Sequence, residues 1–318
     1  MISRRQCLKL GTMGILAAMI PAAMAAAGAK RLVFIHGRGQ AGKDPVALKA
    51  EWLDTLLRGA QAAGVSLPDG IDVVFPYYGD RLEYFSIQDQ IPLTSDIHTR
   101  GGQAQDEFLV FQALVAEEIR QRAGVTDAQV DAEYGANPRQ RGPLNWEWVQ
   151  AILRAIDKHG GGMNQNTLEV FTRDVYLYVT RAGVRDDINR IVAAQLTEEP
   201  TVVVSHSLGT VVAYSILGSD PRRLKVPLFV TVGSPLGVRA IRDQLRPLRF
   251  PSIVDGWYNA FDTRDVVALY PLDADNFPVS PSVENNNAVR NQTDNRHGIV
   301  GYLNDAAVAR RIVNALAS

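Results

Sequence analysis

One stretch of this chain decides its fold: Pro200-Thr201-Val202-Val203-Val204-Ser205-His206-Ser207-Leu208-Gly209-Thr210-Val211-Val212-Ala213-Tyr214. The β-branched run from Thr201 to Val204 predicts a strand that is buried on both faces. Small and polar residues follow, and the apolar stretch from Val211 to Leu217 is long enough for a helix. A strand, a sharp turn with Ser207 at its apex and a helix are together typical of a nucleophile elbow. The unpaired N–H groups at the start of such a helix, and its dipole, favour an oxyanion beside the serine.

The same pattern also fits a buried strand followed by an ordinary polar turn. In the elbow, the residues two before and two after the nucleophile must be small because strand and helix backbones approach each other there. Ser205 replaces the usual glycine at the first of these positions, and Gly209 occupies the second. The sequence before and after this stretch therefore has to decide between the two interpretations.

Length and composition are those of an ordinary globular protein. The 318 residues suit one large α/β domain or two small ones, and a hydrophobic share of 46% suffices for a sizeable core. The net charge of −1 gives no indication of a nucleic-acid partner.

The N-terminal segment predicts export. Ser3-Arg4-Arg5-Gln6-Cys7-Leu8-Lys9 matches the twin-arginine pattern, and a weakly apolar stretch follows that ends in small residues suited to a signal peptidase. The alternative is an uncleaved membrane anchor, but Gly11, Gly14 and Pro21 make the segment less hydrophobic than a good transmembrane helix. We therefore expect residues 1–25 to be cleaved, a periplasmic or secreted protein, and no stable membrane span afterwards.

This cleavage would change the charge and the redox chemistry of the chain. It removes three basic residues and no acidic one, which leaves 30 basic and 34 acidic residues and a formal charge of −4. It also removes Cys7, the only cysteine. The mature chain is therefore expected to have no disulfide, no thiolate nucleophile and no cysteine-ligated metal.

A second turn of interest follows the first predicted strand, Arg31 to Ile35, as His36-Gly37-Arg38-Gly39. A strand that runs into such a turn can offer backbone N–H groups to a ligand. The N–H of Arg38 would then be the partner of the N–H of Leu208 in an oxyanion hole. We expect the His36 side chain to be structural and to hydrogen-bond loop backbone.

The next elements alternate as in an α/β protein. Residues 44–64 predict a helix with Asp44 as its N-cap and Pro45 in its first turn. Residues 71–75 predict a strand that ends before Pro76. Aromatic side chains follow this strand and would either pack loops or line a pocket, namely Tyr77, Tyr78, Tyr84 and Phe85.

Residues 80–180 form a stretch longer than a crossover between two core strands requires. Helices are expected at 105–122 and 146–156, a break at Gly160-Gly161-Gly162, and a strand or short helix at 171–180. We interpret this insertion as a cap over the site rather than an independent domain. A lid of this kind can exclude water and shape specificity.

The remaining chain returns to the alternation of strands and helices. The expected elements are a helix at 184–197, strands at 227–232 and 253–261, a short strand at 288–292 and a final helix at 299–317. Ser234 also follows a strand, but it precedes a proline and lacks the strand–helix turn, so we interpret it as a turn residue.

A serine nucleophile needs a base that removes its proton and an acid that orients the base. When the order along the chain is nucleophile, acid, histidine, the base must be His297, the only histidine after Ser207. His206 adjoins the serine, but neighbouring side chains on such a turn point apart, which indicates a packed residue. His98 and His159 lie in the insertion and are expected at the surface.

Two aspartates follow the predicted strand 253–261 and could orient His297. We assign Asp265, because the apolar pair Val266-Val267 would fix its loop, and keep Asp262 as the alternative. No cluster of His and Asp has the spacing of a metal site, so neither a metal nor an organic cofactor is expected.

With these residues in view, the sequence resembles the α/β-hydrolase-fold serine hydrolases. It is most similar to the esterases and lipases, with Ser-His-Ser-Leu-Gly in place of Gly-x-Ser-x-Gly, over about residues 31–75 and 184–316. The resemblance implies a mostly parallel central sheet flanked by helices. It also implies Ser207 as nucleophile, Asp265 as acid and His297 as base, with the N–H groups of Arg38 and Leu208 as oxyanion hole.

The function expected from this resemblance is hydrolysis of a carboxylic ester through an acyl-enzyme. A lipase, thioesterase, amidase or acyltransferase could use the same residues, because fold and triad do not separate these activities. A non-catalytic binding protein on the same scaffold is the alternative from a different class. The expected partner is a small-molecule ester or lipid substrate, and the oligomeric state stays open.

Overall fold

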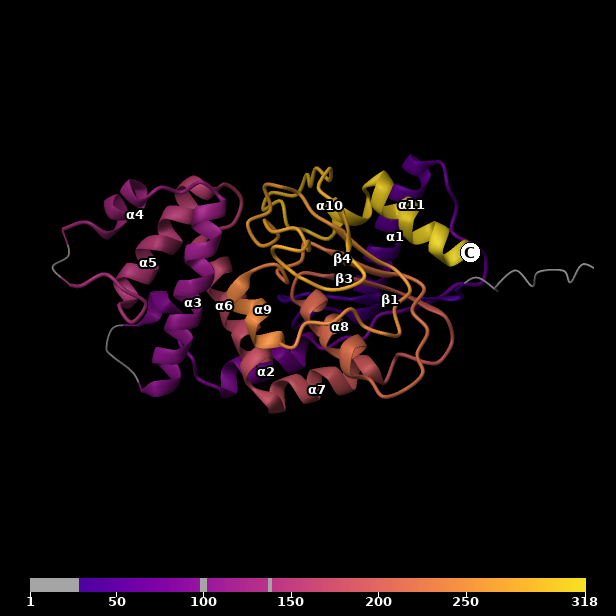
Figure 1. Cartoon of the computed structure of the whole chain (residues 1–318), viewed down its shortest axis with the longest axis horizontal. Helices are drawn as coiled ribbons and strands as arrows, with labels where there is room; N and C mark the ends of the chain where they lie inside the picture. Colours follow the sequence, from indigo (N-terminus) through magenta and orange to yellow (C-terminus); the bar gives the residue numbers. More distant parts are fainter. Residues whose placement is uncertain (1–28, 98–101, 137–138) are drawn as a thin grey trace, which may run out of the picture.

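A computed structural model describes residues 29–97, 102–136 and 139–318 of the chain (Figure 1). The predicted leader 1–25 with Cys7, and also His98, lie outside these residues. Within the described ranges, no helix has both the length and the apolar character that crossing a membrane would require.

A six-stranded sheet forms the centre of the α/β fold, with the strand order β2-β1-β3-β4-β5-β6. Every neighbouring pair is parallel. The strands are β1 (Arg31–Ile35), β2 (Asp72–Val74), β3 (Thr201–His206), β4 (Phe229–Val232), β5 (Trp257–Ala260) and β6 (Glu284–Asn286). β1, β3, β4 and β5 are buried along their whole length, as the continuous apolar runs predict for strands covered on both faces.

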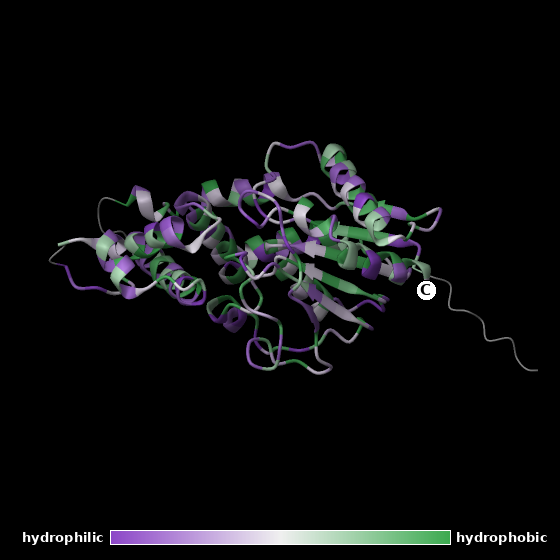
Figure 2. Cartoon of the chain, turned by 90° about the horizontal axis from the view of Figure 1, so that it is seen from above, coloured by the Kyte–Doolittle hydropathy of each residue, from purple (hydrophilic) through white to green (hydrophobic). Residues whose placement is uncertain are grey.

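Helices cover the two faces of this sheet. On one face, Leu32 and Val204 pack with residues of α1 (Pro45–Ala63), α10 (Val300–Leu303) and α11 (Ala306–Ala317). On the other face, Val33 and Val203 pack with α7 (Ala182–Ala193) and α8 (Leu208–Ser219). In Figure 2 the central strands are largely green, whereas the outer helices alternate between green and purple. This alternation is the pattern of helices that bury one side against a sheet.

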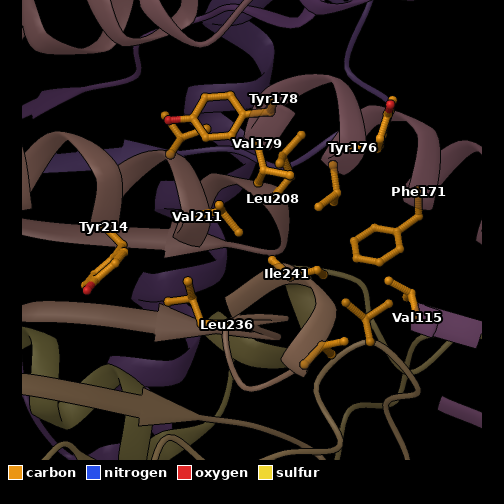
Figure 3. Close-up of a cluster of buried hydrophobic side chains, with 14 of the residues drawn as sticks. Val115, Phe171, Tyr176, Tyr178, Val179, Leu208, Val211, Tyr214, Leu236 and Ile241 are labelled. Atoms are coloured by element: carbon orange, nitrogen blue, oxygen red, sulfur yellow. The ribbon is translucent and has the colours of Figure 1, made fainter. Parts of the chain in front are cut away.

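The chain between β2 and β3 forms a helical region, most of which extends away from the sheet, whereas α7 packs on one face of the sheet (Figure 1). Its elements are α2 (Gly79–Gln88), η1 (Thr94–Asp96), α3 (Gln103–Arg122), α4 (Asp127–Tyr134), α5 (Trp146–Ala155), the π-turn η2 (Ile156–Gly160), α6 (Gln165–Thr180) and α7. Its apolar side chains belong to the same buried cluster as α8 and one face of the sheet. Figure 3 shows Phe171 and Val179 of α6 facing Val211 of α8 and Ile241 of α9 (Arg239–Arg242).

Several boundaries follow the sequence signals closely. The Asp44 side chain accepts from the N–H of Val46, Pro45 is the first residue of α1, and Gly64 ends the helix at φ 69°. Left-handed backbone of this kind favours glycine, which explains the stop.

Three predicted elements are corrected by the structure in type or in bounds. For residues 171–180 the helix is correct and the strand is wrong, but the helix is longer than expected, because these residues end α6, whose N-cap is Asn164. The last strand is β6 at Glu284–Asn286 rather than 288–292; Ala288 makes only an isolated antiparallel bridge to Asp262. The final helix is two helices, because the Asp305 side chain caps a new one by accepting from the N–H groups of Ala307 and Val308.

Candidate active site

The carboxyl ends of β1 and β3 form the centre of the candidate site. The two strands are neighbours in the sheet, and Ile35 pairs with Ser205. The order β2-β1-β3-β4 means that the connections on either side of this pair run in opposite directions. Open parallel α/β sheets bind ligands outside the strand ends at such a switch point.

Ser207 lies in the turn between β3 and α8 with an unusual backbone. Its φ is 55° and its ψ is −130°. A residue other than glycine rarely adopts this region, and holding it there costs about 1–3 kcal/mol. Such strain persists only where the surrounding structure enforces it, and it is concentrated at functional sites.

Two glycines allow the neighbouring backbones to enforce this turn. A Cβ on Gly209 would lie 2.4 Å from the carbonyl oxygens of both Ile35 and His36. A Cβ on Gly37 would lie 2.8 Å from the Cβ of Ser207. The requirement for a small residue at 209 is therefore confirmed, and the strand that approaches α8 there is β1.

Ser205, which replaces the usual glycine, is fully buried. Its Oγ donates to the carbonyl oxygen of Val230 at 3.0 Å. Because that bond satisfies its hydroxyl, a serine can replace glycine at this position without leaving a buried polar group unpaired.

The structure brings Ser207, His297 and Asp265 together in a continuous chain of hydrogen bonds. Ser207 Oγ lies 2.8 Å from His297 Nε2, and His297 Nδ1 lies 2.7 Å from Asp265 Oδ2. A carboxylate only accepts, so the ring hydrogen sits on Nδ1 and Nε2 is free to accept from the serine hydroxyl. All three residues are buried, with exposed fractions of 2%, 8% and 0% in the order named.

Asp265 and Asp262, the two alternatives for the acid, have different surroundings. Asp265 Oδ1 accepts from the N–H of Val267 at 3.0 Å, which leaves Oδ2 for His297. Asp262 instead accepts from the N–H groups of Arg264 and Asn291. Burial alone would raise its pKa, but these N–H groups and the Arg264 guanidinium lower the pKa of Asp262 overall. The geometry thus pairs Asp265 with His297 and gives Asp262 a role in shaping the loop.

The two candidate oxyanion-hole groups belong to two different turns: Arg38 lies in the turn after β1, and Leu208 lies in the turn after β3. Leu208 is the first residue of α8, so its N–H has no carbonyl partner within the helix. Arg38 follows Gly37 and lines the same cavity as Ser207. The Arg38 Nε donates to Asp174 of α6 at 3.2 Å, so the helical region holds the loop that carries Arg38. Burial raises the pKa of Asp174, although Arg38 and Arg173 oppose that change.

His206 and His36 are structural, as expected. His206 Nε2 donates to the carbonyl oxygen of His297 at 2.7 Å. Burial, and then the neighbouring His297, lower the pKa of His206 well below 6.5. His36 Nδ1 donates to the carbonyl oxygen of Gly37 at 2.6 Å, and its Nε2 accepts from the N–H of Tyr78 at 3.1 Å. Burial lowers the pKa of His36 to about 4, so both rings are neutral at pH 7.

The serine opens onto a cavity of about 220 Å³ that separate parts of the chain line. The lining comes from the β1 turn and α1, from residues before and within α6, from the end of β3 with the turn at Ser207, and from the loop around His297. These residues are Arg38, Gln40, Lys43, Leu48, Glu51, Trp52, Met163, Thr167, Phe171, His206, Ser207, Asn295, His297, Gly298 and Ile299.

None of the four aromatic residues after β2 lines this cavity. Tyr78 is buried against His36, with ring centroids 4.0 Å apart. Tyr84 and Phe85 lie on α2, where both rings contact the Arg81 guanidinium. These contacts of Tyr78, Tyr84 and Phe85 are local packing, whereas Tyr77 lines a separate pocket beside β2 and the start of α1.

Ser234 is a buried turn residue without a base. Its Oγ pairs with Thr210 Oγ1 at 2.8 Å and accepts from the N–H of Leu236. Across residues 29–97, 102–136 and 139–318, no group of three or more His, Cys, Asp or Glu side chains is arranged to hold a metal ion.

The sequence did not indicate two residues that hydrogen-bond to members of the candidate triad. Tyr302 of α10 donates its hydroxyl to Asp265 Oδ2 at 2.6 Å, the same oxygen that accepts from His297. The Asn295 side chain accepts from the N–H of His297 at 3.1 Å. Burial raises the pKa of Tyr302 well above 10, and the Asp265 carboxylate adds to this effect, so the hydroxyl stays a donor. Nothing in the local sequence distinguishes Tyr302 from an ordinary apolar residue of a helix.

Comparison with protein-family models, with curated proteins and with solved structures found no match to this chain.

Proposed function

We propose that this chain is a serine hydrolase of the α/β-hydrolase type that cleaves carboxylic esters through an acyl-enzyme. The observation that carries the proposal is the chain from Ser207 Oγ through His297 to Asp265, with separations of 2.8 and 2.7 Å, on a serine held at φ 55°. A binding protein has no need for all three residues in this arrangement. The parallel sheet, with the site at the ends of β1 and β3, is compatible with that fold type.

The proposed reaction starts with attack of Ser207 Oγ on the ester carbonyl while His297 Nε2 takes the hydroxyl proton. Asp265 keeps the ring hydrogen on Nδ1 and stabilises the imidazolium that forms. The N–H groups of Leu208 and Arg38 would hold the tetrahedral oxyanion, and one such donor is typically worth about 3 kcal/mol. His297 then protonates the leaving alcohol and later activates the water that releases the acid.

We further propose that the insertion at about residues 80–180 acts as a cap on this site. Met163, Thr167 and Phe171 wall the cavity opposite Ser207, and Asp174 holds the Arg38 side chain. Water exclusion by such a wall would strengthen the electrostatic interactions at the reacting atoms.

The test is hydrolysis of p-nitrophenyl esters, together with labelling by a fluorophosphonate. Replacing Ser207 by alanine is expected to lower kcat about 10⁶-fold, as loss of a triad serine does, and to abolish labelling. Ser234→Ala is the matched control, because it removes another buried strand-end serine that has no histidine partner. Activity that survives Ser207→Ala would overturn the assignment, and folded protein that is never labelled would favour the binding protein.

We also propose that the enzyme works outside the cytoplasm, because Ser3–Lys9 matches the twin-arginine export pattern. Cell fractionation of the full chain beside an Arg4→Lys, Arg5→Lys variant tests this. Equal export of both would contradict it.

A further inference from the structure

The cavity at Ser207 has an apolar interior and a polar mouth. Leu48, Trp52, Met163 and Phe171 line it and are all less than 7% exposed. Four further lining residues are polar and exposed or half-exposed, namely Gln40, Lys43, Glu51 and Asn295. An apolar group can therefore be desolvated at one end while a polar group stays in water at the other.

The cavity beside Ser207 is small, at about 220 Å³. Cavities for drug-sized ligands start at about 300 Å³. A short acyl group can therefore be buried in this cavity, whereas a long acyl chain does not fit within it.

The α6 residues that line the cavity are fixed by packing and hydrogen bonds on the side of the helix away from the cavity. Phe171 packs into the buried cluster next to Val115 and Ile241 (Figure 3). Glu169 is fully buried and accepts from the N–H of Ser95 at 3.1 Å and from its hydroxyl at 2.6 Å. Because packed interiors resist deformation, this wall limits the size of what the cavity accepts.

Resting on the proposed ester hydrolysis, we propose that the substrates are esters of short apolar acyl groups with polar alcohols. The segment from Met163 to Phe171 sets the limit on the acyl group. The acyl chain lies among Leu48, Trp52, Met163 and Phe171, and the alcohol leaves past the polar mouth.

The experiment is the kcat/KM of p-nitrophenyl esters from acetyl to dodecanoyl, in which only the acyl group changes. Burial of a methylene favours binding by roughly fourfold, so kcat/KM should rise by about that factor for each methylene up to butanoyl or hexanoyl. It should then fall at least about tenfold by dodecanoyl, because a chain larger than the cavity overpacks it.

Two variants of the cavity wall should move the acyl length with the highest kcat/KM in opposite directions. Thr167→Phe fills the cavity from a half-exposed position and should shift the optimum towards acetyl, whereas Met163→Ala enlarges the cavity and should shift it towards longer chains. Asn166→Phe is the matched control, since Asn166 is exposed on the same helix and does not line the cavity.

The outcomes separate this inference from the function on which it rests. Ser207-dependent activity that stays level or rises up to dodecanoyl would overturn the short-chain limit and leave the ester hydrolase standing. The same holds if neither wall variant changes the chain-length profile. Activity that does not depend on Ser207, or hydrolysis of no ester, would overturn both.

Discussion

The sheet and the helical region between β2 and β3 are stabilised in different ways. Strands β1 and β3 are buried and mostly apolar, and the polar side chains of the candidate site lie at and beyond their carboxyl ends. The helical region instead encloses a polar network, in which Gln112 bonds Thr94 and also donates to Thr172 Oγ1 at 2.7 Å. All three side chains are at most 1% exposed.

The sheet and the helical region contribute different things to the candidate site. The sheet places Ser207 through backbone geometry, with Gly37 and Gly209 allowing β1 and α8 to approach closely. The helical region contributes side chains, which form the wall of the cavity and hold Arg38. Substitutions at the carboxyl ends of β1 and β3 should therefore disturb the fold. Substitutions in the helical region should change stability or specificity more mildly.

The largest effect is expected from Gly209→Ala. The added Cβ would meet two carbonyl oxygens at 2.4 Å, and we expect a loss of about 3 kcal/mol or more in the free energy of unfolding. Urea unfolding of the variant and the wild type at pH 7 measures this loss in the free energy of unfolding.

Gly183→Ala on α7 is the control for this substitution. No atom lies within 4 Å of its added Cβ, and the better helix propensity of alanine should make it neutral or stabilising by up to about 1 kcal/mol. Equal effects at the two glycines would show that the close approach to β1 does not constrain the turn.

Acid should lower the free energy of unfolding through His36, at the carboxyl end of β1, by roughly 2–3 kcal/mol between pH 7.5 and 4.5. The folded pKa of His36 is about 4, below the unfolded value of 6.5, so the unfolded chain binds the proton first as the pH falls. This contribution is complete above pH 6.5 and is lost progressively towards pH 4. The buried His206 acts in the same direction.

Urea unfolding at several pH values tests this, with His36→Gln expected to flatten the pH dependence. His159→Gln is the control because His159 is exposed, and it should leave the dependence unchanged. If His36→Gln also leaves it unchanged, the protonation of His36 is not what couples acid to unfolding.

A smaller effect is expected from the polar network of the helical region. Thr172→Val leaves the Gln112 amide without its acceptor and should cost about 1–2 kcal/mol of stability without changing ester hydrolysis. Thr180→Val is matched to it, since both hydroxyls donate to carbonyls of α6 but only Thr172 also accepts from Gln112. If both variants lose the same stability, the bond between Gln112 and Thr172 contributes nothing.

The smallest effect concerns Tyr302, which links α10 to the candidate triad. Tyr302→Phe removes a donor to Asp265 Oδ2, the oxygen that also accepts from His297, so the carboxylate is positioned less firmly for the histidine. We expect kcat to fall about fivefold with KM nearly unchanged, as the loss of one hydrogen bond of about 1 kcal/mol predicts. A purely structural role would lower the stability of the protein and leave kcat unchanged.

Tyr258→Phe serves as the control for Tyr302→Phe. The Tyr258 hydroxyl accepts from Asn286 and makes no contact with the candidate triad. Its kcat and KM should match those of the wild type.

Much of the sheet could be predicted because its signals are local. Apolar and β-branched runs mark β1, β3 and β4, and Asp44, Pro45 and Gly64 mark the ends of α1. Prediction was weakest in α6, where Phe171 to Thr180 carries an apolar and aromatic run that fits a strand as well as a helix. Burial among other helices, which no local pattern reports, explains that run.

The sequence by itself determined the strand–turn–helix around Ser207, the choice of His297 as its possible base, and the α/β class. These follow from residue order and from propensities that act over a few positions. Only the tertiary structure decided that Asp265 rather than Asp262 faces His297, that Tyr302 bonds the same carboxylate, and that α6 walls the cavity. Such pairings depend on how distant segments pack, because a hydrogen bond needs atoms within about 3 Å, and spacing along the chain does not report that distance.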